Sequence, residues 1–243
     1  MKENQIIGEL VARDYRTASV FKKYSIDFCC QGNRTIEEAC EKKNIDTKKV
    51  LEDLVAMMEA KSESTTDYQS WPLDLLADYI EKKHHRYVQE KTLEIQPYLD
   101  KICKVHGERH PELLEIKEEF NASAGELAAH MKKEEMILFP FIRKMTKAKL
   151  ENTKVDAAHF GTVKNPIQMM MNEHTVEGNR FRKIEELSNN YTPPLDACNT
   201  YRVSFALLKE FEQDLHLHIH LENNILFPRA IEIEKELIKN LNA

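Results

Sequence analysis

Apolar residues recur every three or four positions along most of the chain, which is the spacing of one face of an α-helix. Prolines stand near the start of several of these stretches, where a helix tolerates a residue without an N–H group. The pattern predicts four long helices, at residues 72–105, 111–145, 166–187 and 196–222. A kink is expected at Pro97 and a terminal helix after Pro228. Long helices in this succession predict an up-down four-helix bundle.

A shorter helical segment precedes the bundle. Its apolar residues form two stripes, Leu10, Val11, Tyr15, Val20, Phe21 and Tyr24 in one and Val50, Leu51, Leu54, Val55 and Met58 in the other. Residues 61–67 are small and polar without a pattern, which is typical of a linker. We therefore expect an all-α protein with a small helical domain at 1–60, a linker at 61–70 and a bundle at 71–243. A domain of some 60 residues has a marginal hydrophobic core, so the small domain is expected to pack against the bundle or against a second copy in a homodimer.

Composition narrows the class of protein. The 243 residues are 42% hydrophobic and 31% charged, with 6 glycines and a net charge of −6. Glu, Lys, Leu and Ala dominate, as they do in helical proteins. No long basic tract is present, so nucleic-acid binding is disfavoured, because phosphate contacts need clustered Lys and Arg.

The sequence also bears on location. No apolar run approaches the roughly 18 residues that span a membrane. The N-terminal residues MKENQIIGE are acidic where a signal peptide is apolar, so a cytoplasmic protein is expected. An odd number of cysteines without a framework spacing fits reduced thiols: Cys29, Cys30, Cys40, Cys103 and Cys198.

A repeated motif carries the candidate chemistry. His130 precedes Glu134 by four residues, and 88 residues further on His218 precedes Glu222 by four. Both pairs run into Leu-Phe-Pro at the same distance. On a helix, residues four apart lie on one face, so each pair presents an imidazole and a carboxylate together. Such pairs also occur on solvated surfaces, and it is the shared register that favours a functional site here.

Each motif has a further histidine upstream. His84 lies 46 residues before His130, and His174 lies 44 residues before His218. The chain thus has the pattern of a duplicated helical hairpin, and facing helices of a bundle direct side chains to a common interior point. The sequence predicts a dinuclear metal site with two shared carboxylates, formed by His84, His130, Glu134, His174, His218 and Glu222. These ligand types suit iron, and also zinc or manganese.

The full pattern resembles the repair-of-iron-centres proteins, a di-iron family with a hemerythrin-like bundle and a small N-terminal domain. The resemblance covers residues 5–232 and is carried by HHxY at 84–87, HMxKEExILFP at 130–140, EHxxxG at 173–178 and HxxLENNxLFPRA at 218–230. The sequence TPP at 192–194 with AC at 197–198 is similar to the family's connection between the third and fourth helices. FKKYSIDFCCQG at 21–32, followed by AC at 39–40, is similar to its small domain.

The resemblance implies a function. Two iron ions per chain, joined by oxo and carboxylate bridges, would serve the repair of iron–sulfur clusters damaged by nitric oxide or peroxide, either by supplying iron or by clearing NO. Damaged iron–sulfur proteins would be partners, and NO or O2 would be small ligands. Oxygen carriers of the hemerythrin type supply a fifth histidine that has no evident equivalent here, which favours an iron donor. An O2 or NO sensor or carrier, and an enzyme that reduces NO to N2O, stay open as alternatives.

Two adjacent cysteines form a second candidate site. Cys29 and Cys30 lie beside Gly32 and resemble the cysteine pair of the family. Neighbouring thiols ligate iron, carry electrons or close an easily reduced disulfide. The alternative is a pair of small, partly buried apolar residues at a turn. We expect a role in redox chemistry or iron transfer.

Other residues are weaker candidates. Glu126 precedes His130 by four residues and Glu173 adjoins His174, so both are expected behind the ligands or along an iron exit, with surface charge as the alternative. His106 resembles a family position near the end of the bundle, as a ligand, a gate or a loop residue. The remaining histidines are expected at the surface or as helix caps: His85, His110, His159, His216 and His220.

Overall fold

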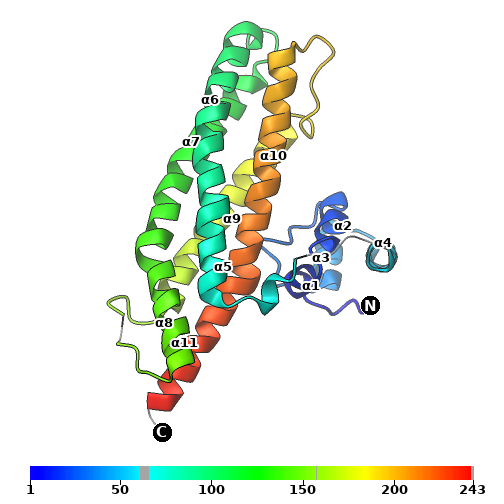
Figure 1. Ribbon diagram of the computed structural model, residues 1–243. Coiled ribbons are helices and arrows are strands. Elements are labelled where there is room, and N and C mark those ends of the chain that lie inside the picture. The colour runs from blue at the N-terminus through cyan, green and yellow to red at the C-terminus, as the bar shows by residue number, and fades with distance from the viewer. Residues whose placement is uncertain (61–65, 157, 242–243) are drawn as a thin grey trace. The chain divides into compact units, whose positions relative to one another are not determined.

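The structure is a computed structural model that describes residues 1–60, 66–156 and 158–241, and helices joined by loops make up most of them (Figure 1). The predicted all-α fold class is confirmed. The chain divides into two compact units: unit 1 comprises residues 1–77, 142–164 and 219–243, and unit 2 comprises residues 78–141 and 165–218. Among the described residues, no helix is both long enough and apolar enough to cross a membrane.

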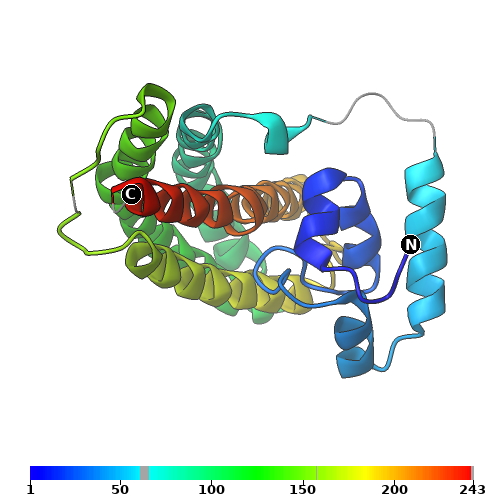
Figure 2. The ribbon, with the colours of Figure 1, turned by 90° about the horizontal axis from the view of Figure 1, so that it is seen from below.

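Long helical runs provide the framework of unit 2 and extend along the chain into residues that belong to unit 1. In chain order, the helices that build these runs are α5 (Leu73–Tyr79), η2 (Ile80–His85), α6 (Arg86–His106), α7 (Glu112–Lys133), η3 (Glu134–Leu138), α8 (Phe139–Glu151), α9 (Lys164–Leu187), α10 (Asn199–Leu221), η4 (Glu222–Leu226) and α11 (Phe227–Leu241). Within unit 2, α6, α7, α9 and α10 run alongside one another in Figures 1 and 2. The runs include the four predicted helices, and α6 continues through Pro97. The fourth helix does not end near residue 222 as predicted, because α10, η4 and α11 form one continuous run through Pro228.

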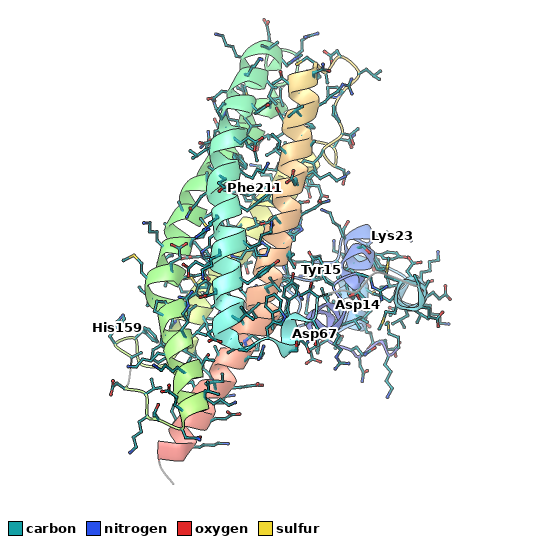
Figure 3. All side chains as sticks on the ribbon, in the orientation of Figure 1. Asp14, Tyr15, Lys23, Asp67, His159 and Phe211 are labelled. Atoms are coloured by element: carbon teal, nitrogen blue, oxygen red, sulfur yellow. The ribbon has the colours of Figure 1, made fainter. Side chains whose placement is uncertain are left out.

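Phe211 lies at the centre of this bundle. Its ring on α10 contacts the rings of Phe120 on α7 and Phe181 on α9, with centroids 5.3 and 5.4 Å apart. The ring of Tyr87 on α6 lies 6.2 Å away. One aromatic side chain, labelled in Figure 3, therefore contacts all three of the other long helices, as expected for the interior of a four-helix bundle.

Three of the helical runs contain a π-helical turn. These turns are η2, η3 and η4, and each either ends with candidate metal ligands or begins at one. In η3 and η4 the backbone N–H of Phe139 bonds to the carbonyl of Glu134, and that of Phe227 to the carbonyl of Glu222. Proline follows one residue later in both cases and has no N–H for an ordinary helical bond, so a wider turn accommodates it without ending the helix.

The N-terminal residues of unit 1 form four short helices, α1 (Ile7–Arg13), α2 (Thr17–Lys23), α3 (Ile36–Lys43) and α4 (Thr47–Glu59), drawn in blue to cyan in Figure 2. Val11, Phe21 and Leu54 are buried in this unit, as the first stripe and part of the second predict. Val55 and Met58 belong to the second predicted apolar stripe, and the expectation that they are buried is wrong, because both are exposed on α4. Of the predicted linker, residues 61–65 lie outside the described residues, and Tyr68–Ser70 form the 3-10 helix η1.

Candidate metal centre

Two groups of buried side chains meet inside unit 2. His130, Glu134 and His174 form one group, and His85, Glu134 and His218 form the other. Within each group the ligand atoms all lie within 4.8 Å of one another, which is close enough to hold a metal ion. Every one of these residues is buried, and Glu134 belongs to both groups. A carboxylate shared between two groups of this kind suits a dinuclear site.

Distances within the groups show how the atoms converge. Nε2 of His130 lies 3.0 Å from Nε2 of His174 and 3.3 Å from Oε2 of Glu134. The same Glu134 oxygen lies 3.4 Å from Nε2 of His85. The rings of His85 and His218 have centroids 5.0 Å apart. Imidazole nitrogens and a carboxylate oxygen, all of them atoms that can ligate a metal, thus converge in a buried volume, which suits a cation.

Carboxylates fix the orientation of three histidine rings. Nδ1 of His130 donates to Glu173 at 2.7 Å, and Nδ1 of His85 donates to Glu135 at 2.9 Å. The hydrogen bond from His130, opposed by burial and helped by Lys133, lowers the pKa of Glu173 to about 2. When Nδ1 carries the proton, Nε2 keeps its lone pair for a metal. His84 has the third ring that a carboxylate orients.

His84 is buried beside the second group. Its Nδ1 donates to Asp214 at 3.0 Å, and its ring stacks on that of His218 with centroids 5.6 Å apart. Its Nε2 is buried and has no hydrogen-bond partner among the described residues. His84 is not a member of either group in this geometry, although a carboxylate orients its ring, as carboxylates orient the rings of His85 and His130.

The expectation that His85 and His220 are surface or capping histidines is wrong. Both are 1% exposed, and His85 belongs to the second group. The α-helical spacing directs neighbouring residues apart, but His84 and His85 end the π-helical turn η2, where that spacing does not hold. His110 does sit at a helix start as expected, bonded to Glu112 and Asp196.

Glu222 belongs to unit 1. It is fully buried and begins the turn η4, which follows directly on α10, the helix that carries His218. The helical run is unbroken from one residue to the other, so the spacing of four that the sequence predicts is present as one turn of helix. Glu134 occupies the same position at the start of η3.

A pocket of about 260 Å³ opens beside the first group. It is lined by His130 and His174 and by four charged side chains, Glu126, Lys133, Glu173 and Glu177. The carboxylates lie at graded depths: the side chain of Glu126 is 57% exposed, that of Glu173 33% and that of Glu177 4%. Burial raises the pKa of Glu177, while its bonds to Ser123 and Arg180 oppose the shift.

His106 lies at the end of α6 and contacts other residues. Nε2 lies 3.2 Å from the sulfur of Cys198, and Nδ1 accepts a weak hydrogen bond from Arg109 at 3.5 Å. Its ring also packs edge-on against Tyr201. None of these is a candidate metal ligand, so a role for His106 at the metal centre stays a prediction.

The two adjacent cysteines are close but form no disulfide. The sulfurs of Cys29 and Cys30 lie 3.7 Å apart, at hydrogen-bond distance for thiols. Asp27 accepts hydrogen bonds from both backbone N–H groups, at 3.2 and 2.9 Å, and the three residues form a third group with the spacing of metal ligands. Contact with Cys30 and burial raise the pKa of the Cys29 thiol well above its usual value.

The bundle and its paired histidine–glutamate groups define a hemerythrin-like metal-binding protein. The family model described as the hemerythrin HHE cation binding domain matches residues 76–230. A second model, ScdA_N, described as a domain of unknown function, matches residues 3–58.

Relatives narrow the class further. The iron-sulfur cluster repair protein YtfE of Yersinia pestis (strain Pestoides F) is 35% identical over 231 residues, which are 95% of this chain and 98% of the relative. The protein of the same name from Yersinia pseudotuberculosis serotype IB (strain PB1/+) is 34% identical with the same coverage. The chain belongs to the family of these iron–sulfur cluster repair proteins.

Proposed function

We propose that the chain carries two iron ions in its bundle and supplies iron to iron–sulfur proteins whose clusters NO or peroxide has damaged. The single observation that carries the proposal is the pair of buried histidine groups joined by Glu134, beside a pocket lined by carboxylates. Relatives with 98% of their length covered are named for iron–sulfur cluster repair, which supports the same function here.

We propose that Glu222 is the second shared carboxylate, as its spacing from His218 predicts. Its burial, its place one turn beyond His218 and its match to Glu134 at an offset of 88 residues support this role. His84 is proposed as a further ligand, because its Nε2 is buried without a partner and its Nδ1 is already held by Asp214. An imidazole in that state binds a cation at Nε2 without losing any hydrogen bond.

The donor set fits iron. Imidazole and carboxylate together suit ferrous and ferric iron, and carboxylates that bridge two ions let both bind in a small volume. Bound iron would supply the cargo for repair and the affinity for NO or O2. The residues of the chain set how tightly it is held: Glu135, Glu173 and Asp214 orient the rings, and the burial of Glu134 excludes water from the ligands.

We propose that Glu126 and Glu173 line the route by which iron enters and leaves. Glu126 is at the surface, Glu173 is bonded to the ligand His130, and both line the same pocket. Lys133 and Arg180 each bind one of these carboxylates, which keeps negative charge in the route from accumulating. The graded depth of the carboxylates suits stepwise passage of a cation.

The cysteine pair has a separate proposed role. Cys29 and Cys30, with Asp27, hold iron in transit or exchange electrons with it. Thiolates are soft ligands that suit iron destined for a cluster. A homodimer and the binding of small diatomics stay predictions.

Repair in a defined mixture tests the proposal. Iron-loaded protein is added to an NO-treated iron–sulfur protein with sulfide and reductant, and the recovery of cluster absorbance is recorded. We expect recovery with the wild type and with Glu118→Gln, which changes an exposed carboxylate on the same helix as His130, and no recovery with Glu134→Gln. Catalytic N2O formation, or reversible binding of a diatomic without loss of iron, would instead support the NO-reducing enzyme or the sensor.

A further inference from the structure

Two asparagines bind the loop that carries the cysteine pair. The side-chain amide of Asn223 donates to the carbonyl oxygen of Cys29 at 3.1 Å, and that of Asn224 donates to the carbonyl oxygen of Phe28 at 3.2 Å. All four residues belong to unit 1. Asn223 is 7% exposed, so its bond is shielded from water, where the loss of a donor leaves a carbonyl unsatisfied.

The backbone at Gly8 and Gly32 lies very close to the side chain of Asn224. A Cβ atom at Gly8 would lie 2.2 Å from the side-chain oxygen of Asn224, and one at Gly32 would lie 2.9 Å from the same atom. The N–H of Gly8 also donates to the carbonyl of Gly32 at 2.7 Å. Glycine is therefore needed at both positions for the asparagine to reach the loop.

His220 supports the same contact from one turn earlier. Asn224 hydrogen bonds to Nδ1 of His220 at 3.0 Å, and the ring of His220 packs against Tyr15 and Phe28, with centroids 5.6 and 6.1 Å away. Tyr15 is labelled in Figure 3. The amide nitrogen of Asn224 can only donate, so Nδ1 of His220 accepts this bond. The contact is thus both apolar and specifically hydrogen-bonded.

These asparagines follow a proposed metal ligand directly. Asn223 and Asn224 are the second and third residues of the π-helical turn η4, which begins at Glu222. The turn is closed by the bond from Phe227 to the carbonyl of Glu222. Glu222, Asn223 and Asn224 share one turn of helix. A ligand that fixes the position of Glu222 therefore also fixes the backbone from which the two amides extend.

We propose that Asn223 and Asn224 are positioning residues that couple the Cys29–Cys30 loop to metal binding at Glu222. The inference rests on the proposed function for the metal. When Glu222 is held by iron, the turn is fixed and the loop stays bound to the two amides. When iron leaves, the turn loosens and the thiols become accessible. The coupling is reciprocal, so binding of the loop also favours retention of iron.

Alkylation of the thiols measures the state of the loop. Full-length protein is treated with iodoacetamide, without metal and with Fe²⁺ under anaerobic conditions, and the modification of Cys29 and Cys30 is followed by mass spectrometry. In the metal-free protein, Asn223→Ala/Asn224→Ala is expected to react about tenfold faster than the wild type, since two hydrogen bonds to the loop are lost. Asn121→Ala, which removes an exposed asparagine on α7, is the matched control and should react like the wild type.

The effect of Fe²⁺ on the alkylation rate distinguishes coupling from a purely structural role, because asparagines that only held the loop would not make that rate depend on iron. Fe²⁺ is expected to slow alkylation in the wild type severalfold and to have no effect on the double variant, although that variant still binds iron. Asn223→Asp/Asn224→Asp keeps the shape of the side chains and removes the donors, so it should behave like the alanine variant even if the latter folds poorly. Circular dichroism establishes that each variant is folded.

The outcomes separate this inference from the proposed function. Equal alkylation of wild type and both double variants without metal overturns the positioning role. Protection by Fe²⁺ that persists in the double variants, or in Glu222→Ala, overturns the coupling, because the thiols then bind iron themselves. If the wild type binds no iron, the proposed function fails and the coupling fails with it, while the metal-free rates still decide whether the asparagines hold the loop.

Discussion

At the scale of the residue, the metal centre depends on which nitrogen of each histidine carries the proton. Nδ1 of His84, His85 and His130 bonds to the carboxylates of Asp214, Glu135 and Glu173 respectively. Each carboxylate orients a ring and leaves Nε2 as the donor atom toward a metal. Affinity is therefore set by residues that never touch the metal as well as by those that do.

Replacing one of these carboxylates tests that conclusion. Glu173→Gln is expected to weaken iron binding about 10- to 100-fold, because His130 loses the partner that fixes its tautomer. Competition against a ferrous chelator measures the affinity. Glu118→Gln removes a carboxylate from an exposed site and should leave it unchanged. Equal affinity for Glu173→Gln and the wild type would show that His130 needs no such partner.

The thiols of unit 1 give a prediction for pH. Because contact with Cys30 and burial raise the pKa of Cys29, its thiol stays protonated at neutral pH and reacts slowly. Iodoacetamide is expected to modify Cys29 much more slowly than the exposed Cys198 at pH 7, with the rate at Cys29 rising as the pH becomes alkaline. Peptide mapping follows both sites. Equal labelling at pH 7 would contradict the burial of Cys29.

Single residues also mark where sequence reasoning succeeds. His130, Glu134, His174 and His218 were predicted from their repeated spacing and come together in the structure. His85 was missed because its place depends on a π-helical turn that no periodic pattern reveals. The carboxylates Glu135 and Asp214 were missed because they act across helices, where spacing along one helix carries no signal.

At the scale of the element, the π-helical turns stand out. A kink was predicted at Pro97 and a separate terminal helix after Pro228, yet Pro228, like Pro140, lies inside a continuous helical run. The wider turns η3 and η4 begin at Glu134 and Glu222, so the prolines help place a carboxylate in each run. His220 could not be foreseen as buried either, because Tyr15 and Phe28, which cover it, are distant in sequence.

Replacing a proline tests the link between turn and ligand. In Pro140→Ala the new N–H can form the ordinary helical bond to Met136, which favours regular helix over the π-helical turn. We expect iron affinity to fall severalfold while the melting temperature of the metal-free protein is unchanged or higher. Metal titration and calorimetry measure the two. Unchanged iron affinity would mean that Pro140 does not help to place Glu134.

The packing of the four helices gives a stability prediction. Phe211→Ala removes a fully buried ring that contacts three others, and it should lower the free energy of unfolding by about 3–5 kcal/mol. Leu93→Ala, at a side chain that is 74% exposed, should change it little. Urea denaturation followed by circular dichroism compares the two. A small effect of Phe211→Ala would contradict its central position.

At the scale of the whole molecule, the duplicated motif explains why two halves of the chain contain equivalent candidate ligands. The hemerythrin family model covers both copies, at residues 76–230, and the small-domain model covers 3–58. The predicted boundaries at 1–60, 61–70 and 71–243 stay a prediction. Residues 219–243 share a compact unit with residues 1–77, which no sequence pattern indicates, since contacts such as Asn223 to Cys29 join segments far apart in the chain.

Iron content is the most direct test of the central claim. Protein purified from iron-fed cells is analysed for metal and by visible spectroscopy, beside Glu134→Gln and the control Glu118→Gln. Because Glu134 belongs to both ligand groups, we predict two irons per chain in the wild type and the control, with ferric oxo-bridged absorption, and loss of both irons in Glu134→Gln. Wild-type iron content in Glu134→Gln, or a wild type without iron, would contradict the di-iron centre.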